Sequence, residues 1–148
     1  MTEADIQTFL NGTLDYFLRV SQAETRLDTP YLRSTENVIF DYTGAISISG
    51  RERGSVLFTA RKEMLQELIR GLGDDDISDT NCRDMVGEVA NTISGNARRE
   101  FGTGFFISVP LIFDPASKEC QLAESNRTFV IPIYWKQHKS HLLVSLES

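Results

Sequence analysis

Residues 84–98 read Asp84-Met-Val-Gly-Glu88-Val-Ala-Asn91-Thr-Ile-Ser-Gly95-Asn-Ala-Arg98, and their periodicity predicts a helix with one apolar side. Successive residues of a helix are 100° apart, so side chains that recur every three or four positions share one side. The apolar side chains fall within an arc of roughly 120°, which predicts that this helix packs on a core. They are Val86, Val89, Ala90, Ile93, Ala97 and Phe101.

The opposite side of this helix is polar and carries the candidate site. It holds Asp84, Glu88, Asn91 and Gly95, with Arg98 at its margin. Glu88 and Asn91 are three residues apart, so their side chains point the same way. A solvated helix face is the simplest interpretation of such a pair. Gly95 favours a binding face instead, because a helical glycine costs about 1 kcal/mol relative to alanine and lets another backbone approach closely.

The rest of the chain predicts an α+β fold, in which long amphipathic helices pack on one face of a mostly antiparallel sheet. Two more helices are expected, over residues 5–20 and 61–72, and Ser78, Asp79 and Thr80 offer N-caps to the central helix. Strands are expected over 37–49, with a bend at Gly44, and over 55–60, 105–113, 128–137 and 142–146. Pro110 and Pro132 fall inside predicted strands and indicate an edge, a bulge or a bend.

Length and composition restrict the class of protein. The 148 residues have the size of one domain, 1–148, and are 41% hydrophobic. The net charge of −6 argues against a nucleic-acid or anionic-membrane partner. No signal core or transmembrane run is present. With Cys82 and Cys120 interpreted as reduced thiols, these features predict a cytoplasmic protein.

The central helix also carries a family resemblance. The pattern Asp84-x-x-x-Glu88-x-x-Asn91-x-x-x-Gly95 closely resembles the signature helix of the CheC/CheX/FliY family of chemotaxis phosphatases. The order of the predicted elements is similar over nearly the whole chain, including Ser108-Val-Pro110, which follows the helix and begins a strand, and the closing strands at 129–133 and 142–146. The CheC branch has two Glu-x-x-Asn motifs, but the first helix here has Thr8 in place of the glutamate before Asn11. A single motif resembles the CheX branch, whose members form homodimers through their sheets.

The resemblance implies an activity and a role for each site residue. Family members dephosphorylate the phospho-aspartate of a CheY-type receiver domain, which brings its own Mg²⁺, so no cofactor or metal is expected on this chain. Asn91 would position the attacking water, and Glu88 would pair with the receiver's lysine. Asp84, Gly95 and Arg98 would contribute to partner binding.

Two other functions stay open at this point. The same helix could bind a receiver or signalling partner without hydrolysis, or the chain could be a purely structural dimer. Two further motifs are weak. His138 and His141 would point to opposite faces of a strand and lack a third metal ligand nearby, and the acidic run at residues 74–76 is interpreted as a solvated loop.

Overall fold

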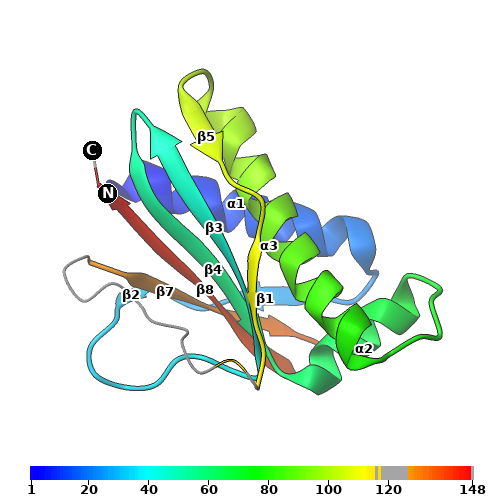
Figure 1. The fold of residues 1–148 in the computed structure, drawn as a ribbon. Coiled ribbons are helices and arrows are strands. Elements are labelled where there is room, and N and C mark those ends of the chain that lie inside the picture. The colour runs from blue at the N-terminus through cyan, green and yellow to red at the C-terminus, as the bar shows by residue number, and fades with distance from the viewer. Residues whose placement is uncertain (116, 118–126, 148) are drawn as a thin grey trace.

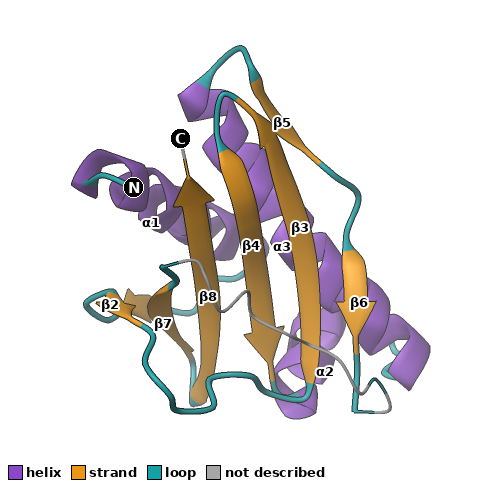
Figure 2. Cartoon of the chain, turned by 60° about the vertical axis from the view of Figure 1, so that its left-hand side comes forward, coloured by secondary structure: helices purple, strands orange, loops and turns teal. Residues whose placement is uncertain are grey.

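In the computed structural model, which describes residues 1–115, 117 and 127–147, three helices cover one face of an eight-stranded antiparallel sheet (Figures 1 and 2). The predicted α+β class is confirmed. The helices are α1 (Glu3–Val20), α2 (Lys62–Gly71) and α3 (Asp79–Phe101). The strands are β1 (Thr25–Leu27), β2 (Tyr31–Leu32), β3 (Tyr42–Gly50), β4 (Arg53–Ala60), β5 (Phe105–Ile107), β6 (Leu111–Phe113), β7 (Phe129–Trp135) and β8 (His138–Glu147).

The sheet is built from neighbouring hairpins. Its order is β1-β7-β8-β4-β3-β5, with β2 also paired to β7 and β6 also paired to β3. Two hairpins, β3–β4 and β7–β8, pair with each other through β4 and β8 and form the centre. The described part of the chain has no helix that is long and apolar enough to cross a membrane.

The central helix lies directly on this sheet, as its apolar stripe predicts. Five of the six predicted core side chains of α3 are fully buried, and Phe101 packs against the same core at the end of the helix. Gly44 of β3 lies beneath α3, and a Cβ atom there would stand only 2.7 Å from the Val86 carbonyl oxygen. The sequence predicted a bend at Gly44; the structure instead gives this glycine the role of admitting the helix backbone.

Several predicted boundaries were wrong. The strand expected over 105–113 is two short strands separated by residues 108–110, as Pro110 indicated. The first long strand begins at Tyr42 rather than Asn37, and β8 is longer than the predicted 142–146. The short strands β1 and β2 were not predicted, because two or three residues carry no periodicity.

Pro132 is accommodated inside β7 by those two short strands. A residue in an antiparallel strand directs its N–H and C=O toward the same neighbour. The Pro132 carbonyl accepts a hydrogen bond from the Asp28 N–H at 3.0 Å, just beyond the end of β1. The N–H that proline lacks would therefore point toward the gap between β1 and β2. No hydrogen bond between β7 and β8 is lost.

Replacing Gly44 with alanine tests the close approach of α3 to the sheet. The new methyl group would overlap the backbone of α3, so we expect the free energy of unfolding to fall by about 1–3 kcal/mol in urea denaturation. Gly71→Ala is the matched control, because a Cβ there meets nothing within 4 Å. If both variants had equal stability, the close contact would be contradicted.

Candidate functional site

The outward side of α3 carries three exposed polar side chains at its centre. Asp84, Glu88 and Asn91 are exposed, and Gly95 is half-buried. Among the described residues, the first three side chains have no hydrogen-bond or ion-pair partner. The structure thus brings the predicted pair Glu88 and Asn91 together on one accessible surface.

Both ends of α3 are fixed to the rest of the fold. At the start, the Ser78 hydroxyl accepts a hydrogen bond from the Asn81 N–H, and the Tyr42 hydroxyl donates to Asp79 at 2.7 Å. The Tyr42 hydrogen bond and the Lys62 ammonium group, 3.4 Å away, lower the pKa of Asp79 below its ordinary value. These contacts hold the helix in one orientation, which is what a precisely placed site needs.

The second half of α3 is held by side chains that reach backbone carbonyls. Asn96 donates from Nδ2 to the Gly12 carbonyl of α1 at 3.0 Å. Arg98 donates from Nε to the Phe105 carbonyl at the start of β5, at 3.2 Å. Arg98 was predicted as a partner-binding residue; the structure also gives it an internal contact, which secures the chain after α3.

The two glycines inside α3 have different environments. Gly87 is buried, and a Cβ there would stand 2.7 Å from Cδ1 of Ile112, so packing against β6 explains it. At Gly95 a Cβ would meet nothing within 4 Å. Internal packing therefore does not explain Gly95, and its bare surface lies beside Glu88 and Asn91 on the exposed face.

Tyr16 of α1 lies close enough to Glu88 to sense its charge. The Tyr16 side chain is buried, and its hydroxyl has no hydrogen-bond partner among the described residues. Burial raises the pKa of Tyr16, and the Glu88 carboxylate raises it further. Sequence patterns gave no sign of this proximity, because Tyr16 occupies an ordinary core position of α1.

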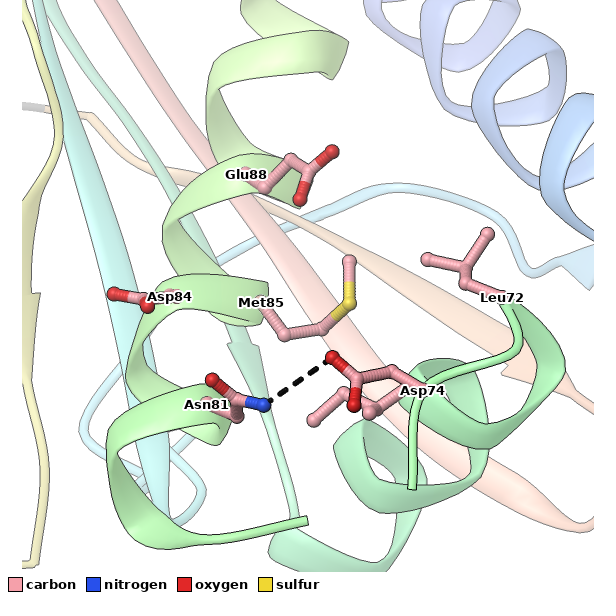
Figure 3. Close-up of a pocket in the computed structure, with 7 residues that line it drawn as sticks. Leu72, Asp74, Asn81, Asp84, Met85 and Glu88 are labelled. Carbon is pink, nitrogen blue, oxygen red and sulfur yellow. Dashed lines mark hydrogen bonds between the residues drawn. The ribbon is translucent and has the colours of Figure 1, made fainter. Parts of the chain in front are cut away.

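A groove between α2 and α3 adjoins Glu88 (Figure 3). Its volume is about 240 Å³. Ile69, Leu72 and Met85 supply apolar surface; Asp74, Asn81, Asp84 and Glu88 supply the polar surface. Figure 3 shows Leu72 and Met85 facing one another, with the hydrogen bond from Asn81 to Asp74 closing one end. Asp74 lies in the exposed loop that the acidic run at residues 74–76 predicts, but no sequence pattern predicts the groove.

Comparison with known proteins identifies the family and the fold of this chain. The sequence profile of a family described as "Chemotaxis phosphatase CheX" matches residues 42–134, which is more than half of the chain. The chain belongs to the CheX family. No curated protein sequence matches it significantly.

Solved structures of CheX-like proteins share the fold over nearly the whole chain. A putative chemotaxis protein from Desulfovibrio vulgaris Hildenborough has 25% sequence identity and a TM-score of 0.83, with 97% of each chain covered. CheX from Vibrio vulnificus has 20% identity and a TM-score of 0.84, covering 97% of this chain and 99% of its own. The Borrelia burgdorferi CheX–CheY–BeF3–Mg²⁺ complex matches at 18% identity and a TM-score of 0.77, with 97% of each chain covered.

The remaining sequence motifs of this CheX-family chain lie away from α3's exposed face. His138 contacts Glu67 at 3.1 Å, whereas the buried His141 contacts the Val38 carbonyl at 2.8 Å. Cys82 is a free, buried cysteine, and burial raises the pKa of its thiol. The other predicted thiol, Cys120, lies outside the described residues.

Tyr16→Phe tests whether the buried hydroxyl is unpartnered. A buried hydroxyl without a hydrogen bond costs about 1–3 kcal/mol, and phenylalanine keeps the ring while removing that cost. We expect the variant's melting temperature, measured by circular dichroism, to equal or exceed that of the wild type. Tyr42→Phe is the control and should lower the melting temperature, because this change removes the hydrogen bond to Asp79. A marked loss of stability in Tyr16→Phe would show that the Tyr16 hydroxyl does have a hydrogen-bond partner.

Proposed function

We propose that this CheX-family chain is an aspartyl-phosphate phosphatase that acts on a phosphorylated CheY-type receiver domain. One observation carries the proposal: Glu88 and Asn91 stand exposed and without internal partners on a helix whose ends are fixed. Carboxylate and amide groups placed this way suit recognition of a partner's charged site. The solved complex of CheX with CheY from Borrelia burgdorferi supports a receiver as the partner class.

Asn91 is the residue to which we assign catalysis. Its amide can both donate and accept hydrogen bonds, so it can hold a water molecule in line with the phosphorus atom. Water then forms a bond to phosphorus as the bond from phosphorus to the aspartate oxygen breaks. The products are inorganic phosphate and the free aspartate carboxylate. The Mg²⁺ of the receiver stabilises the charge on the phosphoryl group, and this chain needs no nucleophile or metal of its own.

Glu88 is the residue to which we assign docking. A carboxylate on the exposed face can form a charged hydrogen bond with the lysine of the receiver's active site. Such a pair fixes the position of α3 along the receiver and therefore the position of Asn91, one turn further on. Asp84 and Gly95 extend the same contact surface on either side. The homodimer that the sequence predicts stays a prediction, and this mechanism needs only one chain.

Asn91→Ala should remove most of the acceleration. We expect kcat/KM for loss of phosphate from the phosphorylated receiver to fall by about 10- to 1,000-fold, which corresponds to one to several kcal/mol of transition-state stabilisation. Asn11→Ala is the matched control, because Asn11 is an exposed asparagine on α1 and should leave the rate unchanged. Phosphate release from each purified variant is the measurement.

Two results of that assay would contradict the mechanism. If Asn91→Ala retained the wild-type rate, another residue would position the water. Tight binding of the receiver by the wild type, with an unchanged phospho-aspartate lifetime, would instead indicate a non-catalytic adaptor that uses the same helix.

Gly95→Ala should separate stability from activity. Alanine in the interior of a helix is favoured over glycine, and no atom opposes the new methyl group, so the free energy of unfolding should rise by about 0.5–1 kcal/mol. The same methyl group would keep the receiver's backbone from its closest approach, so kcat/KM should fall. Urea denaturation and phosphate release, measured on one preparation, check both effects. An unchanged kcat/KM would show that the receiver does not approach Gly95.

A further inference from the structure

Glu88 and Asn91 together are too small to form the whole surface on which a receiver docks. A specific protein interface buries about 800 Å² of surface on each partner. The contact surface must therefore continue beyond these two side chains, and α3 has two flanks along which it can do so. One flank is the groove toward α2, and the other is the edge of the sheet at β5 and β6.

The groove flank is continuous with the proposed catalytic face. Glu88 is itself one of the groove's lining residues. Asn81 and Asn91 are ten residues apart on α3, so the groove lies within about 15 Å of the catalytic amide along the helix. A domain that covers Glu88 therefore also covers the edge of the groove that Glu88 lines.

The composition of the groove indicates what it binds. Leu72 is 51% exposed at the end of α2, yet its N–H is bonded to the Leu68 carbonyl, so the side chain is presented from a fixed backbone. Three acidic residues, Asp74, Asp84 and Glu88, line the groove together with its apolar side chains, and no basic side chain of the described residues lines it. A protein side chain with an apolar part and an adjacent positive charge is the complement of such a surface.

The size of the groove agrees with a protein segment rather than a metabolite. Its volume of about 240 Å³ lies below the roughly 300–1,000 Å³ of small-molecule pockets. It is large enough to receive one or two side chains from a partner.

The opposite flank also has exposed apolar residues, but it is not lined by Glu88. Phe106, Val109 and Leu111 are exposed there, and Val109 is 82% exposed. The groove is favoured because it is continuous with Glu88 and carries a charge that a basic partner would complement. Docking at the sheet edge is the alternative that the experiment below distinguishes.

We propose that the groove between α2 and α3 is a second docking site for the same receiver domain. It takes up a segment beside the receiver's active site that presents an apolar side chain flanked by Lys or Arg. This inference rests on the proposed function. It makes Leu72 and Asp84 specificity-determining residues that contribute affinity without taking part in the chemistry.

The test measures binding and turnover in parallel. The probes are CheY-type receiver domains from the source genome, loaded with Mg²⁺ and BeF3⁻ for binding and phosphorylated for turnover. We expect Leu72→Ser and Asp84→Asn each to raise Kd and KM about five- to tenfold while kcat stays unchanged. Asp84→Asn should also weaken the dependence of binding on salt concentration. Leu18→Ser and Asp75→Asn are matched controls, because Leu18 is exposed on α1 and Asp75 does not line the groove.

The results separate the groove from the proposed catalysis whenever the wild type binds a receiver. Wild-type Kd and KM in both groove variants would overturn the docking site, while acceleration by the wild type would leave the phosphatase function standing. Weakened binding in Val109→Ser alone would place the receiver on the sheet edge and overturn the groove. Weakened binding in the groove variants, with Asn91→Ala as active as the wild type, would support the groove and contradict the catalytic role of Asn91. Failure of every receiver to bind the wild type would overturn both.

Discussion

The contact between α3 and β3 is the constraint on which the rest of the structure depends. Gly44 has no side chain, and this lets the backbone of α3 at Val86 lie almost against the strand. Because the helix is so close, five of the six side chains of its apolar stripe are fully buried, while the opposite stripe is directed away from the sheet. The rotation of α3 about its own axis is thereby fixed, and with it the direction of every polar side chain of the candidate site.

The same packing explains why α3 can be both a core element and a binding surface. One side of the helix contributes to the hydrophobic core, and the hydrogen bonds of Asn96 and Arg98 secure its second half. The exposed side therefore needs no internal partners to stay in place. The backbone fixes the positions from which Asp84, Glu88 and Asn91 project, so a partner has to order these side chains but not the helix.

Helical periodicity allowed the sequence to predict this division. The burial of Val86, Val89 and Ile93 and the exposure of Glu88 and Asn91 all follow from 3.6 residues per turn. Periodicity placed Gly95 on the polar side, and the structure likewise gives it no packing neighbour. Gly87 is explained by Ile112, which is distant in sequence, so only the structure accounts for it. Helical periodicity thus predicted which side of α3 is polar. The tertiary contacts showed which residues on that side have no internal role and are available to a partner.

Features that depend on two separate elements escaped prediction. The groove joins Leu72 at the end of α2 to Met85 in α3, and Tyr16 approaches Glu88 from α1. Neither arrangement leaves a periodic signal, because each arises from the way helices cross. The short strands β1 and β2 were missed for a similar reason, since they exist through pairing with β7 rather than through their own composition.

The most direct test of the central claim is an experimental structure of this chain bound to a receiver domain that carries Mg²⁺ and BeF3⁻. We expect α3 to lie across the receiver's active site, with the Asn91 amide within hydrogen-bond distance of a water in line with the beryllium fluoride and Glu88 paired with the receiver's lysine. A complex in which the receiver sits on another surface and leaves Asn91 in solvent would contradict it.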